Sequence, residues 1–269
     1  MAPLLAVGFA ARWRGANSAA IPQELPRAVH QLKVPAGIRK TGPWVVCLSG
    51  LIDAPIDSQF TLDRQGHLSI YHEKLGLIVT GANSKHQPEL ATFLEKVKDR
   101  VTTIPLSSRL RMSDDGDRLG LGYPTFFAEA HVPAPGARRL AFHFAITETG
   151  HGRLQDVRLN LQLRLQAGEA LGTARTKIVL DGSRLELGPD RIGGRLHHRG
   201  WTLSVDPAAR LTWPVLPFNP YANAPERDLR HAIGVLTVPV TVRPPSAGAP
   251  LDWRRGEIAF VLEAPGTGD

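Results

Sequence analysis

A nine-residue alternation constrains the fold of this chain more than any other feature of its sequence. From Val157 to Leu165 every odd position is apolar and every even position is polar. Side chains of a β-strand point alternately to the two faces of a sheet. The segment therefore predicts a strand with one face in the core and the other in water.

Other short apolar runs recur along the chain and are separated by turn-forming residues. The sequence contains 26 glycines and 22 prolines, and no unit repeats at a fixed period. Many short strands with frequent turns predict an all-β chain, a large antiparallel two-sheet β-sandwich of the supersandwich type. Four hairpins are predicted: Leu68–His72 with Leu77–Thr80 around Gly76, Ser107–Ser113 with Arg118–Tyr123 around Asp114–Asp117, Lys177–Leu180 with Arg184–Leu187 around Asp181-Gly182, and Trp201–Val205 with Arg210–Trp213 around Asp206-Pro207.

One segment has the spacing of a helix. Pro88 suits the first helical position, and Glu89 suits the positive end of the helix dipole. Apolar residues then follow at helical intervals, so the sequence predicts one short helix of about three turns here. These residues are Leu90, Phe93, Leu94 and Val97.

The first part of the chain differs from the rest in its patterning. Residues 1–43 contain four prolines and no sustained periodicity, which predicts an extended, loop-rich lead-in. Strand signals begin at Trp44. Because 269 residues can form one large all-β unit, residues 44–269 are predicted to form a single β-sandwich domain.

The charge of the chain favours acidic partners. Thirty-two lysines and arginines against 25 acidic residues give a net charge of +7, which favours nucleic acid, acidic polysaccharide or an anionic surface. No stretch approaches the roughly 20 apolar residues of a membrane span. The single cysteine excludes an internal disulfide framework and a cysteine-based zinc site.

No cofactor and no metal site is predicted. The sequence contains no phosphate-binding P-loop, no dinucleotide fingerprint after a strand and no Gly-x-Ser-x-Gly elbow. His197 and His198 are adjacent, so on a strand they point to opposite faces and do not share an ion. The Asp114–Asp117 run lacks the spaced ligands and terminal glutamate of an EF-hand.

A first polar cluster surrounds the predicted hairpin at Gly76. A neutraliser for a uronate carboxylate, a base for the C5 proton and an acid for the leaving oxygen are the groups that β-elimination on an acidic polysaccharide requires. Tyrosine, histidine, lysine and asparagine can supply them, and polar groups at strand ends are the alternative interpretation. If the strand ends and the following loop lie together, the candidate catalytic residues are Tyr71, His72, Asn83, Lys85 and His86.

A second cluster combines basic and aromatic residues. Sugars stack their C–H faces on aromatic rings and hydrogen-bond at their edges, and single-stranded nucleic acid uses a similar mixture. In the alternative interpretation Trp201 and Trp213 are core residues of a hairpin, and Arg227 belongs to a solvated loop. The candidate ligand-binding residues are Arg195, His198, Trp201, Trp213, Tyr221 and Arg227.

Three segments resemble a known family. The runs Leu62–Gly81, His198–Leu203 and Trp213–Tyr221 are similar in style to the C-terminal all-β part of heparinase II/III-type polysaccharide lyases. In that family a helical toroid precedes the β part and supplies much of the active site. The resemblance implies the back portion of such an architecture, with an upstream helical domain as a partner that is absent from this chain.

Three functions follow from these features. The first is a non-catalytic carbohydrate-associated β-sandwich module that supports or binds polysaccharide, including acidic polysaccharide, as the tail of a larger lyase. The alternative is a polysaccharide lyase acting by β-elimination on uronate-containing glycans. A basic nucleic-acid-binding module is the second alternative, which is disfavoured because the basic residues are scattered along the chain. The sequence assigns no ligand identity, oligomeric state or cellular compartment.

Overall fold

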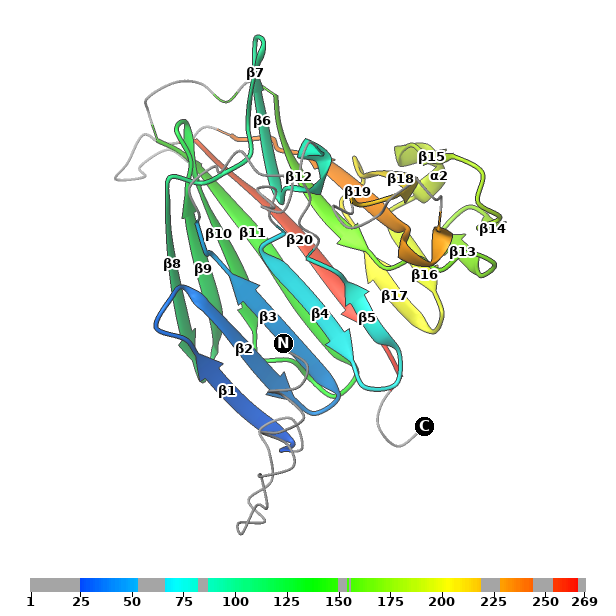
Figure 1. The fold of residues 1–269 in the computed structure, drawn as a ribbon, viewed down its shortest axis with the longest axis horizontal. Helices are drawn as coiled ribbons and strands as arrows, with labels where there is room; N and C mark the ends of the chain where they lie inside the picture. The colour runs from blue at the N-terminus through cyan, green and yellow to red at the C-terminus, as the bar shows by residue number, and fades with distance from the viewer. Residues whose placement is uncertain are drawn as a thin grey trace, which may run out of the picture.

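The structure, a computed structural model, consists of two antiparallel sheets packed face to face. It describes residues 25–52, 66–81, 87–149, 154, 156–218, 228–243 and 254–265. Every pairing between named strands is antiparallel. Figure 1 shows β1–β5 lying over β8–β11 and β20, and one continuous cluster of buried apolar side chains fills the space between the sheets. The predicted all-β sandwich is confirmed.

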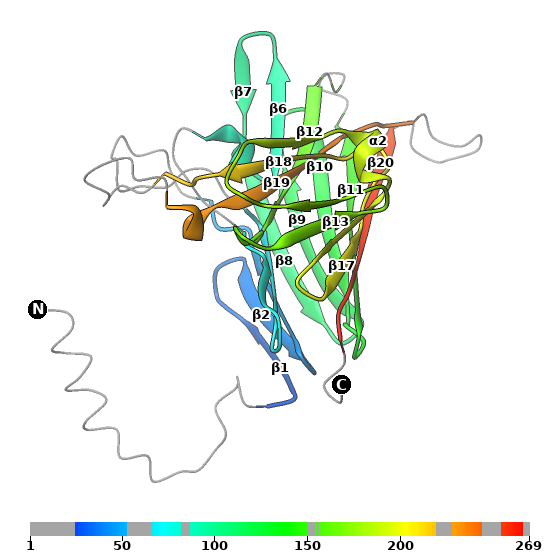
Figure 2. The same cartoon turned by 90° about the vertical axis from the view of Figure 1, so that its right-hand side faces the viewer.

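The first sheet, called sheet A, has eleven strands in the order β1-β2-β3-β4-β5-β12-β19-β18-β15, and β6 pairs with both β12 and β7. The β6–β7 hairpin projects beyond the sandwich (Figure 2). The strands of sheet A are β1 (Arg27–Gln31), β2 (Ala36–Thr41), β3 (Trp44–Ser49), β4 (Leu68–His72), β5 (Gly76–Val79), β6 (Phe93–Val97), β7 (Arg100–Thr102), β12 (Asp156–Leu163), β15 (Leu185–Leu187), β18 (Arg210–Val215) and β19 (Ile233–Pro239).

The second sheet, called sheet B, has nine strands in the order β14-β13-β16-β17-β20-β11-β10-β9-β8. Its strands are β8 (Ser107–Ser113), β9 (Gly116–Gly122), β10 (Phe126–Pro133), β11 (Arg139–Glu148), β13 (Ala170–Thr173), β14 (Lys177–Val179), β16 (Arg195–His198), β17 (Trp201–Ser204) and β20 (Arg255–Glu263). Three short helical segments complete the described elements: η1 (Pro88–Leu90), α2 (Pro189–Ile192) and η2 (Leu229–His231).

The strand predicted from the strict alternation is β12, but only part of its polar face is in water: Arg158 is exposed. The odd positions face the core as expected, whereas Asn160 and Gln162 are also buried. Their side-chain amides donate to the main-chain oxygens of Ala91 and Leu90, at 3.1 and 3.0 Å. The segment around η1 therefore covers part of the outer face of β12. Its buried main-chain carbonyls need hydrogen-bond donors, which the side chains of Asn160 and Gln162 supply.

The helix predicted from Pro88 is wrong beyond its first turn. Only the three residues of η1 are helical, and Phe93 begins strand β6, which pairs with β12. Leu90 packs with Ile233 and Val235 on the outer face of sheet A, whereas Phe93 belongs to the main core on the other side. The two apolar side chains thus serve opposite faces of the sheet and do not share one helical face.

Two of the four predicted hairpins are instead crossings between sheets. The turn at Asp181-Gly182 leads from β14 of sheet B to β15 of sheet A, and the turn at Asp206-Pro207 leads from β17 of sheet B to β18 of sheet A. The hairpins β4–β5 and β8–β9 form as predicted, with Gly76 at φ +76°. A turn residue fixes a local reversal of the chain, but it does not choose the strand that pairs next.

Two strands precede Trp44 within the predicted lead-in. β1 and β2 form a ladder with β3, and they lie where sheet A faces β8 and β9. A buried ion pair joins the sheets here: Arg39 of β2 donates to both carboxylate oxygens of Asp117 of β9, at 2.8 and 2.6 Å. Neither side chain is exposed. The hydrogen bond to the Asp117 carboxylate raises the pKa of Arg39.

Candidate functional site

Tyr71 lies on the outer face of sheet A beside a cavity of about 310 Å³. In β4 the alternate residues Ile70 and His72 are buried, so Tyr71 points away from the core, and it is 41% exposed. It sits opposite Val45 of β3, which in turn sits opposite Lys40 of β2. We call the cavity the Tyr71 groove; it is lined by Ala28, His30, Ile38, Lys40, Val45, Tyr71 and Glu73.

The Tyr71 groove has an apolar floor and a charged end. Ala28, Ile38 and Val45 supply aliphatic surface next to the tyrosine ring. At its end the Lys40 ammonium lies 2.7 Å from a carboxylate oxygen of Glu73. An aromatic ring beside aliphatic groups and fixed hydrogen-bonding groups is a surface that can hold a flat molecule with polar edges.

His72 faces the opposite side of the same strand and lies in the core. Its side chain is fully buried, and its ring contacts Trp44 edge-on with centroids 4.6 Å apart. Burial lowers the pKa of His72, against smaller raising effects of the Pro265 carbonyl and Glu73. The predicted catalytic pair Tyr71 and His72 is therefore divided between the outer surface and the interior.

The other predicted catalytic residues, Asn83, Lys85 and His86, lie outside the described residues. Gly81, which precedes them, lies against Leu68 and Ser69. These two residues begin β4, whereas Tyr71 and His72 end it. In an antiparallel hairpin the exit of the second strand adjoins the start of the first, so the chain leaves this hairpin at the end away from Tyr71.

The predicted ligand-binding residues also separate into different environments. Trp201 and Trp213 are buried in the core, as the alternative interpretation held, but they belong to sheets B and A and not to one hairpin. His198 is buried, and burial lowers its pKa. Arg195 is exposed, and its guanidinium lies 3.4 Å from the Glu263 carboxylate. The remaining two residues, Tyr221 and Arg227, lie outside the described residues.

The flanks of the two segments that lie outside the described residues meet at Gln87. Its side-chain amide donates to the Leu216 carbonyl at 2.9 Å and accepts from the Phe218 main-chain N–H at 2.7 Å. Gln87 directly follows residues 82–86, and Phe218 directly precedes residues 219–227. The fold thus joins the chain positions next to the two predicted clusters.

The same part of sheet A contains a compact charged turn at η2. Two nitrogens of the Arg230 guanidinium donate to the Asp228 carboxylate at 2.9–3.1 Å, which lowers the pKa of Asp228 to about 2. Arg164, which directly follows β12, donates to the main-chain carbonyls of Arg230 and Ala232. These bonds fix the turn beside β12.

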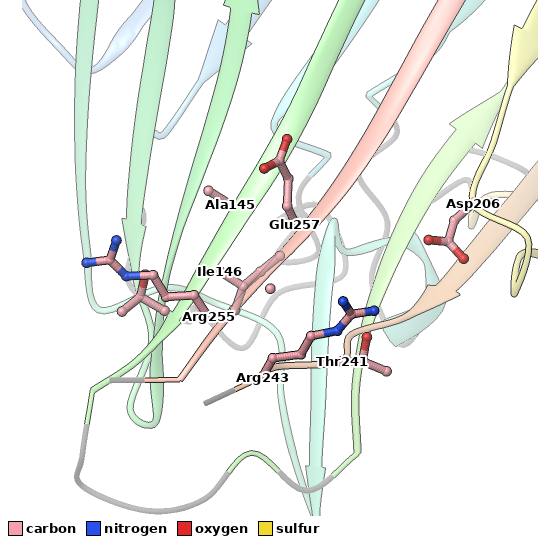
Figure 3. A pocket seen from close by; sticks show the side chains of 9 residues that line it. Ala145, Ile146, Asp206, Thr241, Arg243, Arg255 and Glu257 are labelled. Carbon is pink, nitrogen blue, oxygen red and sulfur yellow. The ribbon is translucent and has the colours of Figure 1, made fainter. Parts of the chain in front are cut away.

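A second cavity, of about 550 Å³, lies beside β20 and was not predicted from the sequence. Strand β17 pairs through three residues, Thr202–Ser204, and only with the last residues of β20, because the chain then crosses to sheet A. Figure 3 shows Asp206, Thr241 and Arg243 to one side of β20 and Ala145 and Arg255 to the other. Four strand ends meet here, so no single sequence pattern signals the site.

Across the described ranges, no group of three or more His, Cys, Asp and Glu side chains is placed to hold a metal ion. His197 and His198 face opposite sides of β16, the first exposed and the second buried. No helix in the described part of the chain is long and apolar enough to cross a membrane.

Comparison with known proteins gives one kind of match. No family model matches the chain, and no curated protein does. Among solved structures, the chain is similar to the heparan sulfate lyase HepC from Pedobacter heparinus, with 9% identity over 90% of this chain and a TM-score of 0.47. A mutant of that lyase gives 10% identity over 89% of this chain and a TM-score of 0.45. The chain spans 37% of the length of either lyase. The sequence resembles heparinase II/III-type lyases, and both of these solved structures are heparan sulfate lyases.

Proposed function

We propose that this chain is a non-catalytic carbohydrate-associated β-sandwich module and that the Tyr71 groove binds a sugar ring. The observation that carries the proposal is an outward tyrosine ring flanked by aliphatic side chains in a cavity closed by a charged pair. A sugar ring offers C–H groups on its face and hydroxyls on its edge. The ring face suits Tyr71, and the hydroxyls suit Lys40 and Glu73.

The charged pair supports binding in preference to elimination. The Lys40 side chain is only 12% exposed, and its ammonium is already held by Glu73. A compensated ammonium is a weak neutraliser for the carboxylate of a uronate, which elimination requires. His72 is enclosed in the core, so it does not reach a substrate on the outer face.

The proposal is tested by measuring the affinity of the full chain for neutral and acidic polysaccharides in affinity gels. The substitution Tyr71→Ala is expected to weaken binding of a neutral glucan about tenfold, which is the affinity that one stacked aromatic ring contributes. The matched control is Phe127→Ala, since Phe127 is also 41% exposed but lies on sheet B. Equal affinity of Tyr71→Ala and the unaltered chain for every glycan would overturn the proposal.

A second candidate function is polysaccharide cleavage by β-elimination, and one observation favours it. Tyr71 and His30 line the same cavity as Lys40, so groups able to transfer a proton surround one space. Elimination creates an unsaturated uronate that absorbs in the ultraviolet. A flat absorbance trace with heparin, alginate and chondroitin is expected. A rising trace that Tyr71→Phe abolishes would make the chain a lyase.

A further inference from the structure

Four basic side chains form a row across the outer face of sheet B. Arg111 of β8 sits directly opposite Arg118 of β9, Arg118 sits opposite His131 of β10, and His131 sits opposite His143 of β11. The residues next to them in their strands, such as Leu110 and Phe142, are buried, so the row faces outward. We call this set the basic row.

The basic row places like charges side by side. Cross-strand pairs of like charge destabilise a sheet, so the direct opposition of Arg111 and Arg118 is unfavourable without an anion. Arg118 has a partner in Glu129, at 2.8 Å, whereas Arg111 has no ion pair within the described part of the chain. The imidazole rings of His131 and His143 touch edge-on with centroids 4.9 Å apart. The row therefore offers more cationic groups than its own neighbours neutralise.

We propose that the basic row binds an acidic polysaccharide whose carboxylate or sulfate groups lie along it. Four strands at a spacing of about 4.8 Å give a row about 14 Å long, which suits successive anionic groups of a linear polymer. Alanines on the same face beside the row, Ala141, Ala145 and Ala259, leave room for an extended chain. The choice of a sugar polymer rests on the proposed function, but the row is a different site from the Tyr71 groove.

Carboxylates on this face favour polysaccharide over nucleic acid. Glu129 lies within the face, and Glu257 and Glu263 of β20 point outward beside it. Sugar hydroxyls can donate hydrogen bonds to carboxylates. A nucleic-acid strand, with a phosphate at every nucleotide, would meet them as like charges.

The histidines make the binding depend on pH. Burial, the Arg118 guanidinium and the His143 imidazole hold the pKa of His131 below its ordinary value, whereas Glu129 and Asp115 act in the opposite direction. Facing His131 are Arg118 from β9 and His143 from β11, with Arg111 beyond Arg118; His143 faces the uncharged Ala259 of β20, with Glu257 two residues along. A bound anion favours the imidazolium forms, so affinity is expected to rise as the pH falls.

The test measures binding of the full chain to heparin, a neutral glucan and a single-stranded oligonucleotide by calorimetry. Arg111→Gln is expected to weaken heparin binding about fivefold at low salt, whereas Arg210→Gln, an exposed arginine of β18 on sheet A, leaves it within about twofold. Heparin affinity of the unaltered chain should rise at least about fivefold between about pH 7.5 and about pH 5.5. The double variant His131→Gln/His143→Gln should reduce that rise to below about twofold.

Each contrary outcome has a distinct meaning. Equal losses in Arg111→Gln and Arg210→Gln would show attraction by net charge alone and overturn the basic row. An oligonucleotide that binds as tightly as heparin and responds equally to Arg111→Gln would overturn the assignment to polysaccharide. A pH rise that persists in the double variant would overturn the role of the histidines. Loss of glucan binding in Tyr71→Ala concerns only the Tyr71 groove, so the two proposals fail separately.

Discussion

The inner and outer faces of strands β2 to β4 both hold polar side chains, but the two faces use them differently. Inside, Arg39 is held by Asp117 of the opposite sheet, and both side chains are excluded from water. Outside, Lys40 is held by Glu73 of its own sheet, and the Glu73 side chain is 44% exposed. Arg39 and Lys40 are adjacent in the sequence, but Arg39 belongs to a buried ion pair between the sheets, whereas Lys40 lines a surface cavity.

The difference shows how strand alternation separates stability from recognition. A buried ion pair that loses one partner leaves a charge without solvation, so its partners are fixed. A surface pair can exchange one partner for water or a ligand at small cost. Substitutions on the inner face should therefore change unfolding, and those on the outer face should change binding.

The largest expected effect is on the inner face, at Asp117. Asp117→Ala leaves the Arg39 guanidinium buried without its carboxylate and should lower the free energy of unfolding by about 3–5 kcal/mol. Urea unfolding followed by tryptophan fluorescence measures the change. The control is Asp114→Ala, because the Asp114 side chain is fully exposed in its ion pair with Arg27; this substitution should leave the free energy of unfolding nearly unchanged. Similar costs for the two variants would contradict the contrast between the faces.

A second interior group makes stability depend on pH. His67 is buried, its Nδ1 lies 2.7 Å from the Ser49 carbonyl, and burial lowers its pKa from 6.5 to about 4. The folded state thus favours the neutral ring. The stabilisation is complete above the unfolded pKa of 6.5 and is lost as the pH falls toward 4, by about 3 kcal/mol.

Unfolding in urea across that pH range tests this expectation. The variant His67→Gln should show a shallower loss of stability on acidification than the unaltered chain. The surface control is His30→Gln, which should leave the slope unchanged because His30 lies at the outer groove. An unaltered slope in His67→Gln would show that other groups carry the acid sensitivity.

The local parts of the fold could be predicted from the sequence. The β4–β5 and β8–β9 hairpins are contained in short segments, where alternation and the turn residue agree. The sequence predicts hairpins at the crossings Asp181-Gly182 and Asp206-Pro207 because a turn signal is local, whereas distant packing determines the strand that pairs next. The helix predicted from Pro88 failed for a related reason, since Leu90 and Phe93 serve opposite faces of sheet A.

The candidate site was predictable only in part for the same reason. Tyr71 stands out in the sequence because it ends an apolar strand beside polar residues. Its groove partners His30 and Lys40 come from β1 and β2, in a segment without clear periodicity. The basic row is likewise spread over four strands and becomes visible only through their register.

A smaller effect is expected from truncating the neighbours Tyr71 and His72. His72→Ala removes a fully buried ring packed on Trp44 and should cost about 2 kcal/mol of unfolding free energy. Tyr71→Ala removes a half-exposed ring and should cost less than about 1 kcal/mol. For glucan affinity the order should be reversed, and Tyr71→Ala should weaken binding more than His72→Ala does. Equal losses of stability in the two variants would show that Tyr71 is a packing residue and would contradict the proposal that the Tyr71 groove binds a sugar ring.

The smallest expected effect concerns the pair of Lys40 and Glu73, and it tests most directly whether the outer face is open to a ligand. A double-mutant cycle with Lys40→Met and Glu73→Gln should give a coupling of about 0.2–1 kcal/mol in the free protein, reduced at high salt. A sugar whose hydroxyls bridge the two groups binds both at once, so saturating glucan should change this coupling. The coupling energy of an ion pair remote from the groove, such as Arg184 with Glu186, should not change when glucan is added. A coupling energy that changes with neither salt nor glucan would show that Lys40, like Arg39, belongs to a structural ion pair of the sheet and not to a binding site.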